Sequence, residues 1–398
     1  MLTPAEAAAA IAAELAPLAA ESCALADAAG RVLREELAAE RDQPPFDRVA
    51  MDGIAVASEA LAAGRRAFRI AGTVAAGRPP ATLPGEDACL EVMTGAMLPP
   101  GTDTVIPVES LVLAEGRATL REEAPPARYA NVHRRASDAR AGSRALAAGT
   151  RLRGPELAIA ASAGRAALAV SREPRIAVIS TGDELVGPGL ALEPWQIRRS
   201  NAYGVAATLA LHGYARLSDD HIADDPATLC ARLAAHLTRH DVLILSGGVS
   251  AGRFDHVPAS LESVGVRRVF HKVAQRPGKP LWFGVGPGGQ PVFALPGNPV
   301  STLVCLIRYV LPALERLCGA PAPAVPSVPL ADGYESRHPL TAFVPVDRGR
   351  AAGRPAAVTL HPTHGSGDFT ALAGTAGFVE LAPGRRIEPG EAVPIYTW

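Results

Sequence analysis

Apolar residues recur at three- and four-residue spacing over residues 3–20 and 24–39, which predicts two helices at the start of the chain. The pattern then changes, because residues 41–130 hold short β-rich runs separated by Gly and Pro pairs. The strands predicted there cover 68–74, 88–94, 104–107 and 118–120. Arg- and Ala-rich turns follow, with one more predicted helix at 155–163. This pattern predicts a small all-β unit inserted into a mainly helical one.

From residue 174 onward, continuous apolar runs alternate with helical patterns. Buried strands are predicted at 175–180, 241–245, 280–284 and 291–295. Helices are predicted at 201–212, after Asp224-Asp225-Pro226, and at 300–317, with Asn201 as the first N-cap and Gly213 at the end of that helix. Strands that alternate with helices predict a parallel sheet covered on both faces.

The predicted fold class is a multidomain α/β protein. A Pro/Ala-rich linker at 320–329 precedes short β-like runs, which predict a C-terminal β-domain. We expect a helical domain from 1–40 and 131–173, an inserted β-domain at 41–130, an α/β domain at 174–319 and a C-terminal β-domain at 320–398.

Composition narrows the class of protein. The net charge of −1 argues against nucleic acid as a partner, and no apolar run is long enough to cross a membrane. The first twenty residues lack a basic start and carry Glu6 and Glu14, which argues against a signal peptide. The five cysteines form no Cys-x-x-Cys pair, which indicates a reducing cytoplasm and neither a zinc site nor a disulfide framework.

Only two of the 39 basic residues are lysine, Lys272 and Lys279. They flank the turn Arg276-Pro277-Gly278. Lysine is a compact, strongly hydrated charge, which suits phosphate or another small oxyanion. Chance in an arginine-biased chain is the alternative, and the neighbouring motifs argue against it.

Gly-rich motifs stand where the predicted strands end, and ligands of parallel α/β sheets bind at the carboxyl ends of the strands. Glycine lets the backbone approach a ligand, Ser and Thr hydroxyls add donors, and the helix N-terminus after Asn298 favours an anion. A site for a phosphorylated, polar ligand is therefore predicted, without a Walker A or Gly-x-Gly-x-x-Gly motif. The motifs are Ser180-Thr181-Gly182-Asp183-Glu184-Leu185, Ser246-Gly247-Gly248-Val249-Ser250, Arg276-Pro277-Gly278-Lys279-Pro280 and Leu295-Pro296-Gly297-Asn298-Pro299-Val300-Ser301.

Carboxylates accompany these loops. Asp183, Glu184, Asp224 and Asp255 would repel a phosphorylated ligand unless a divalent cation lay between them, and Mg²⁺ is the usual one. Asp225 is better explained as the N-cap of the next helix, and Asp183 could instead bond within its own turn.

In the β-rich segment, Asp52 and Thr94 are polar residues in otherwise apolar, Gly-flanked motifs, Met51-Asp52-Gly53 and Met93-Thr94-Gly95-Ala96. On their own, two tight turns would explain them equally well.

Together these motifs resemble the MoeA family of molybdopterin molybdenumtransferases, which includes the E domain of gephyrin. The resemblance runs essentially end to end and also rests on Asp224-Asp225-Pro226. The α/β motifs alone would fit adenylylating relatives as well, but the flanking domains and Met51-Asp52-Gly53 favour the transferase. The resemblance implies a MogA-like doubly wound α/β domain.

The resemblance implies the final step of molybdenum cofactor synthesis. Adenylylated molybdopterin would bind with its pyrophosphate on the Gly-rich loops, molybdate would be inserted at the dithiolene sulfurs, and hydrolysis of the phosphoanhydride would release AMP. Mg²⁺ would assist, held by Glu184, Asp224 and Asp255. Lys272, Arg276 and Lys279 would attract molybdate and the terminal phosphate.

Other roles follow from the resemblance. Asp138 would close the site, and Ser366 would reach in from the C-terminal domain. A homodimer is implied, in which the site lies between two protomers, so that Asp52 and Thr94 act across the interface. An adenylyltransferase and a molybdoenzyme or its chaperone are the implied partners. The residues implied to bind the pterin nucleotide are Ser180, Thr181, Gly182, Asp183, Ser246, Gly247, Gly248, Val249, Ser250, Pro277, Gly278, Pro296, Gly297, Asn298, Pro299, Ser301 and Ser366.

Four positions depart from the family pattern. Arg253 stands where an acid is common, Ile54 where tyrosine is common, Pro345 where arginine is common and Arg276 where lysine is frequent. They keep open a non-catalytic or specialised paralogue that binds and delivers the pterin cofactor. A third reading is a pterin adenylyltransferase, which would consume ATP and free molybdopterin.

Overall fold

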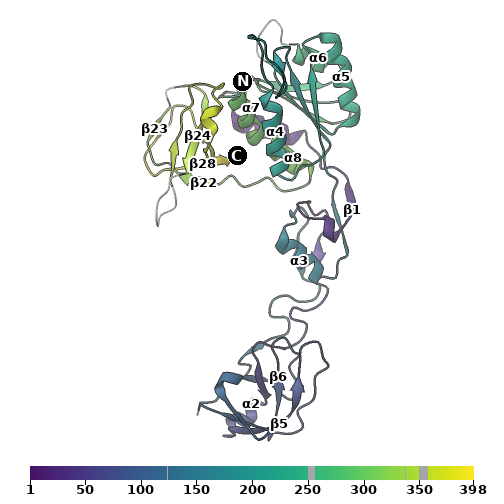
Figure 1. Cartoon of the computed structure of the whole chain (residues 1–398), viewed down its shortest axis with the longest axis vertical. Helices are drawn as coiled ribbons and strands as arrows, with labels where there is room; N and C mark the ends of the chain where they lie inside the picture. Colours follow the sequence, from purple (N-terminus) through teal and green to yellow (C-terminus); the bar gives the residue numbers. More distant parts are fainter. Residues whose placement is uncertain (123, 250–255, 337, 349–356) are drawn as a thin grey trace.

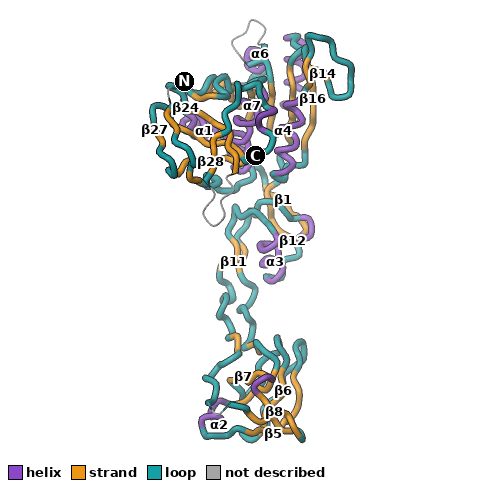
Figure 2. Tube along the Cα trace, turned by 60° about the vertical axis from the view of Figure 1, so that its left-hand side comes forward, coloured by secondary structure: helices purple, strands orange, loops and turns teal. Residues whose placement is uncertain are grey.

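The chain is elongated, with its parts spread along one long axis (Figures 1 and 2). The computed structural model describes residues 1–122, 124–249, 256–336, 338–348 and 357–398. An α/β body and a C-terminal β body lie together at one end, a small module with α3 lies in the middle, and a separate β-sheet lies at the other end. The multidomain α/β architecture expected from the sequence is confirmed.

A six-stranded sheet forms the centre of the α/β body, in the order β16-β13-β17-β21-β20-β18. The first four strands are parallel, while β20 is antiparallel to both β21 and β18. The expected all-parallel sheet is therefore wrong for the predicted strand at 280–284. The strands are β13 (Ile176–Thr181), β16 (Leu217–Ile222), β17 (Val242–Ser246), β18 (Arg267–His271), β20 (Trp282–Val285) and β21 (Pro291–Leu295).

Helices cover both faces of this sheet, as the sequence predicts. One buried cluster joins one face to α1, α4, α7 and α8, and a second joins the other face to α5 and α6. The segment between α7 and α8 is a π-helical turn, η3. The bounds are α1 (Pro4–Ala13), α4 (Ser200–Leu211), α5 (Pro226–Arg239), α6 (Val257–Ser263), α7 (Pro299–Cys305), η3 (Leu306–Val310) and α8 (Leu311–Leu317).

Helix ends agree with the sequence in part. Asp225 caps α5 by accepting from Thr228 N at 2.8 Å, and Gly213, with φ +85°, ends α4, both as predicted. Asn201 is not the N-cap of α4, because Arg199 occupies that position. The first helix is shorter than 3–20 and ends at Ala13.

A small neck module, made of β1, β2, β11, β12, η1 and α3, lies between the two ends (Figure 1). The helix expected at 24–39 is wrong. Its apolar spacing is helical, but its backbone donors bond another segment: Gly30 N to Leu152 O at 2.7 Å and Leu33 N to Thr150 O at 2.9 Å. The predicted helix at 155–163 is confirmed. The bounds are β1 (Ala20–Ala24), η1 (Leu25–Asp27), β2 (Leu37–Ala38), β11 (Arg144–Leu146), α3 (Gly154–Ser162) and β12 (Ala167–Ser171).

Two connectors, residues 39–48 and 133–143, run side by side from the neck to the far sheet (Figure 2). They bond each other, with Gln43 N donating to Ala139 O at 2.7 Å and Ala39 N to Ser143 O at 2.9 Å. At the far end β3 (Arg48–Val49) pairs with β10 (Val132–His133).

The distal sheet follows the order β7-β4-β6-β5-β9-β8, and the four strands predicted in this segment are confirmed. Two buried apolar clusters support it. The elements are β4 (Gly53–Val56), α2 (Ser58–Ala62), β5 (Ala67–Val74), β6 (Ala88–Val92), β7 (Thr104–Pro107), η2 (Val108–Ser110), β8 (Leu111–Ala114) and β9 (Arg117–Leu120).

The C-terminal sheet has the order β19-β24-β26-β28-β22, so a strand of the α/β body joins it. No helix in the described residues could cross a membrane. The elements of this sheet are β19 (Gln275–Arg276), β22 (Ser327–Pro329), β24 (Thr341–Arg348), β25 (Val358–Leu360), β26 (Gly377–Leu381) and β28 (Ala392–Thr397). The remaining elements are the strand pairs β14 (Leu185–Val186) with β15 (Ile197–Arg198) and β23 (Tyr334–Glu335) with β27 (Arg386–Ile387), and the turn η4 (Thr370–Leu372).

Candidate functional site

The predicted loops meet at one edge of the α/β sheet. The carboxyl ends of β13, β17 and β21 lie side by side there, since these strands are parallel neighbours. Because β20 is antiparallel, its N-terminal end reaches the same edge and brings the Arg276-Pro277-Gly278-Lys279 turn with it. The reversed strand is thus the reason that the lysines join the Gly-rich loops.

The loop after β13 is bonded to the end of β16. Gly182 has φ +137°, its N–H donates to Ile222 O at 3.4 Å, and its carbonyl lies 2.8 Å from His221 Nε2. The sequence analysis did not predict His221, since a single histidine within a strand carries no motif.

Two buried hydroxyls at the end of β13 have no hydrogen-bond partner within the described residues. Ser180 Oγ and Thr181 Oγ1 belong to side chains that are 1% and 2% exposed, and no hydrogen-bond partner for either lies within the described residues. A Cβ built at Gly247 or Gly248 would lie 3.0 or 3.1 Å from Thr181 Oγ1, and both glycines have positive φ. Unpaired buried hydroxyls are rare and costly, so a polar ligand is the natural partner.

The rest of the loop after β17 is less accessible. Ser246 and Val249 are 6% and 1% exposed, and His271 Nε2 lies 3.3 Å from Val249 O. Val249 belongs to a buried apolar cluster, so only its backbone can serve a ligand. Ser250 lies outside the described residues.

The loop after β21 connects to the C-terminal body. Asn298 Nδ2 donates to Ser366 Oγ at 2.6 Å, and Val300 N donates to Ser366 O at 3.1 Å. Asn201, which the sequence analysis predicted to be a helix N-cap, instead donates through Nδ2 to Gly297 O at 2.8 Å. Ser366 therefore contacts the loop after β21. Pro296 and Pro299 flank it, and Ser301 is 3% exposed in α7.

Three carboxylates gather near the same edge. Asp224 N donates to Asp183 Oδ1 at 3.1 Å. Burial, and then the charges of Asp183 and Glu184, raise the pKa of Asp224. A divalent cation bound near these side chains would relieve the repulsion between their charges.

A complete metal centre is not defined by the described residues. Among them no group of three or more His, Cys, Asp or Glu side chains lies close enough to hold an ion. The third expected ligand, Asp255, lies outside the described residues, as does Arg253.

The segment from Lys272 to Lys279, called the cationic turn below, is open to solvent at its charged side chains. Arg276 and Lys279 are exposed and Lys272 is half-buried, while Pro277 is half-buried and Gly278 buried. Within the described part of the chain none of the three cations has an ion-pair partner. An anion could therefore approach all three without displacing a carboxylate.

Asp52 and Thr94 lie together, but at the far end of the molecule. Thr94 N and Oγ1 donate to Asp52 Oδ1 at 2.6 and 2.7 Å, which lowers the pKa of Asp52. Gly53 is required beside them, since a Cβ there would lie 1.9 Å from Ile106 O. Both residues belong to the distal sheet, so one chain does not bring them to the α/β edge (Figure 1).

Asp138 lies on a connector rather than at either end. Its Oδ1 is 2.8 Å from His133 Nε2, and Arg48 bonds His133 Nδ1 at 2.9 Å. An arginine can only donate, so Nδ1 accepts and Nε2–H donates to Asp138. That hydrogen bond lowers the pKa of Asp138.

Three of the four departures from the family pattern lie within the described residues: Ile54, Pro345 and the exposed Arg276. Ile54 is 1% exposed in the core of the distal sheet, and Pro345 is buried in β24 opposite Phe378. A proline there offers an anion no hydrogen-bond donor.

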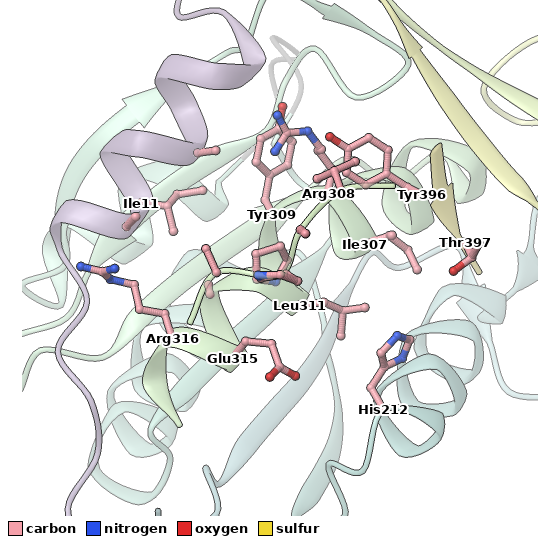
Figure 3. A pocket seen from close by; sticks show the side chains of 18 of the residues that line it. Ile11, His212, Ile307, Arg308, Tyr309, Leu311, Glu315, Arg316, Tyr396 and Thr397 are labelled. Atoms are coloured by element: carbon pink, nitrogen blue, oxygen red, sulfur yellow. The ribbon is translucent and has the colours of Figure 1, made fainter. Parts of the chain in front are cut away.

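An apolar cavity of about 480 Å³ lies elsewhere, between α1, the η3–α8 segment, residues 322–326 and β28 (Figure 3). Ile11, Ile307, Leu311 and Tyr396 are among its walls. None of the predicted site residues that the structure describes lines it, so it is separate from the candidate site.

Family models match most of the chain. Residues 2–164 match the MoeA N-terminal region (domain I and II), residues 177–316 a probable molybdopterin binding domain, and residues 327–398 the MoeA C-terminal region (domain IV).

Relatives and solved structures agree with these matches. A molybdopterin molybdenumtransferase of Synechocystis sp. is 40% identical over 373 residues and covers 93% of each chain. Another, from Synechococcus elongatus, is 39% identical and covers 75% of each. A molybdopterin biosynthesis MoeA protein from Pyrococcus horikoshii superposes with a TM-score of 0.78 at 28% identity, over 100% of this chain and 99% of that one.

Proposed function

Since this chain belongs to the MoeA family, we propose that it catalyses the last step of molybdenum cofactor synthesis. It is a transferase whose substrates are molybdate and adenylylated molybdopterin. The dithiolene sulfurs bind molybdenum, an oxygen displaced from molybdate leaves as water, and a water molecule splits the phosphoanhydride to give AMP and the cofactor phosphate.

One observation carries the pterin nucleotide site. The loops after β13, β17 and β21 converge at one edge, where Ser180 and Thr181 hold buried hydroxyls without partners in the described residues. The pyrophosphate would take these hydroxyls and the N–H groups of Gly248 and Gly297 as donors. The hydrogen bond to Ser366 would orient the Asn298 side chain beside the pyrophosphate.

Mg²⁺ is proposed to be held by Glu184, Asp224 and Asp255. It would neutralise charge on the phosphate that leaves with AMP. Burial, and then the charges of Asp183 and Glu184, raise the pKa of Asp224, and a bound cation would favour the ionised carboxylate against both effects.

Lys272, Arg276 and Lys279 are proposed to attract molybdate and the terminal phosphate. All three carry unpaired charge within the described residues, at the edge where the loops meet. Long-range attraction by such a cluster raises the local concentration of a doubly charged anion.

A homodimer with a shared site is proposed, because Asp52 and Thr94 lie far from the α/β edge of their own chain (Figure 2). A second copy would bring its distal sheet to this edge, with Asp138 of a connector closing the site. The protein would work in the cytoplasm, take its substrate from an adenylyltransferase and pass its product to a molybdoenzyme or its chaperone.

AMP release by the purified protein tests the function. With Mg²⁺ and adenylylated molybdopterin, AMP should appear in a molybdate-dependent manner together with active cofactor. Tight binding of the pterin nucleotide without release would instead favour the binding paralogue, which the transferase relatives do not support. Consumption of ATP and free molybdopterin would identify an adenylyltransferase.

A further inference from the structure

The backbone of the cationic turn is closed by its own hydrogen bonds. Lys272 N donates to Leu281 O at 2.9 Å, Val273 N to Lys279 O at 2.9 Å, and Leu281 N to Gly278 O at 3.2 Å. None of these bonds involves the Pro277 carbonyl, at the tip between the two exposed cations.

A buried side chain holds that carbonyl. Gln275 is 0% exposed, and its Nε2 donates to Pro277 O at 3.1 Å and lies 3.6 Å from Cys305 Sγ. A Cβ built at Gly278 would be 2.5 Å from Gln275 Nε2 and 2.6 Å from Cys305 Sγ. The turn therefore rests directly on these two side chains.

Tyr309 fixes Gln275 in turn. Its hydroxyl donates to Gln275 Oε1, and the residue is 1% exposed. Burial raises the pKa of Tyr309, so the hydroxyl keeps its proton and remains the donor. With both ends of the amide bonded, the side chain has one orientation, with Nε2 toward Pro277.

The π-helical turn η3 carries Tyr309 to this position. π-turns inside α-helices are uncommon and occur often at functional sites. The preceding residue, Arg308, bonds Glu380 of β26 at 2.9 Å, and Tyr396 bonds the same carboxylate at 2.7 Å. The turn η3 is thus fixed to the C-terminal sheet on one side and to the cationic turn on the other.

We propose that Gln275 and Tyr309 are positioning residues for the oxyanion step: they hold the Pro277 carbonyl and thereby keep Arg276 and Lys279 in place for molybdate. The proposal rests on the proposed function. Charged groups on a fixed turn lose little freedom when an anion binds, whereas a loose turn must be ordered at that moment.

Two conservative variants test the pair. Tyr309→Phe removes one hydroxyl, and Gln275→Met keeps the length of the side chain without its amide. Each should raise the KM for molybdate by up to about tenfold while kcat and the Mg²⁺ dependence stay unchanged, since one lost buried hydrogen bond corresponds to about that factor. The double variant should raise the KM no further, because both residues act through one carbonyl.

Tyr214→Phe is the matched control. Tyr214 is also a buried tyrosine of the α/β body, and its hydroxyl donates to Glu315 at 3.0 Å, away from the turn. It should lower the melting temperature about as much as Tyr309→Phe and leave the KM for molybdate unchanged. Equal KM changes in both tyrosine variants, or additive changes in the double variant, would overturn the proposal.

Direct binding separates this proposal from the proposed function. Calorimetric titration with tungstate, an oxyanion of the same shape and charge, needs no turnover. If the unsubstituted protein releases no AMP but binds tungstate more tightly than Tyr309→Phe, the positioning role stands and the proposed function fails. If AMP release is molybdate-dependent and tungstate binds both proteins equally, the positioning role fails alone. If the unsubstituted protein neither releases AMP nor binds tungstate, both fail.

Discussion

Thr181 combines two properties that rarely occur together, since its hydroxyl is buried and no partner for it lies within the described residues. Such a group costs stability in the free protein and is available to a ligand. Opposite effects of one substitution on folding and on binding are therefore expected.

Thr181→Val should raise the free energy of unfolding by about 1 kcal/mol, because a methyl group of equal size replaces an unpaired hydroxyl. It should weaken binding of adenylylated molybdopterin by about tenfold, the factor of 1.4 kcal/mol. Urea unfolding and calorimetric titration measure the two quantities.

Thr302→Val is the contrasting variant, since Thr302 Oγ1 already donates to Pro296 O at 2.6 Å. It should lower the free energy of unfolding. Lower stability for Thr181→Val as well, with unchanged ligand affinity, would contradict a ligand role for the Thr181 hydroxyl.

Single residues were predictable from sequence where local chemistry decides. Asp225 as an N-cap and Gly213 as a helix end follow from backbone rules that act within a few residues. Asn201 bonds Gly297 and His221 bonds Gly182, contacts between positions 96 and 39 residues apart, and no local rule contains them.

At the scale of elements, neighbouring strands decided more than propensity did. The segment 24–39 has helical spacing, but residues 150–171 accept its backbone donors, so strands and turns form instead. The strand at 280–284 was found, whereas its direction depends on pairing with β18, which the sequence pattern did not reveal. The wrong strand direction does not change the predicted position of the candidate site, because the reversed strand places the lysines at the same edge.

Two arginines that precede β13 bond a carboxylate that precedes β17, and so join the starts of the two strands. Asp241 bonds Arg172 at 2.8 Å and Arg175 at 3.1 Å. Burial alone would raise the pKa of Asp241, but the hydrogen bonds of both guanidinium groups outweigh burial and hold the pKa well below its usual range.

Acid should therefore weaken this part of the sheet. A lowered pKa stabilises the fold fully above the ordinary aspartate pKa of about 3.9, and this stabilisation declines as the pH falls below that value. The difference in free energy of unfolding between the unsubstituted protein and Asp241→Asn should be constant from pH 7 to about pH 5 and shrink toward pH 3. Urea unfolding at several pH values measures it.

Asp87→Asn serves as the reference for that series. Asp87 pairs with Arg69 at 3.8 Å on the surface, where ion pairs contribute little. A difference for Asp241→Asn that stays constant down to pH 3 would show that its charge is not the stabilising property.

At the scale of the whole molecule, the proposed site residues lie at the two ends of the elongated molecule, except for Asp138 on a connector (Figure 1). The sequence suggested the parts and their order, and the matched family regions follow the same order. The domain boundaries proposed from composition stay a prediction. How far apart the ends lie could not be read from the sequence, because the length of the connectors, rather than any motif, sets it.

A complementation experiment tests the shared site. Asp52→Ala and Glu184→Ala should each abolish AMP release, since every site of either homodimer lacks one residue. After subunit exchange at equal amounts, half of the dimers are mixed and each holds one intact site, so about a quarter of the original activity should return.

Glu184→Ala mixed with Asp224→Ala is the control, because both substitutions lie on the same α/β edge and no mixed dimer holds an intact site. No recovery in the first mixture although mixed dimers form would place the whole site within one chain. Recovery in this control would show that Glu184 and Asp224 do not serve the same site, which contradicts the proposed division of residues.

The paired connectors also determine how the distal sheet can move. A body held by one chain can swivel about every bond of that chain, in all directions. Here two segments bond each other, Gln43 to Ala139 and Ala39 to Ser143, and form a narrow two-segment ribbon. A ribbon bends easily across its face and resists bending in its plane and twisting. The paired connectors therefore restrict the distal sheet to motion mainly in one direction, across the face of the ribbon. The sheet can then approach a partner only along the arc that this bending allows.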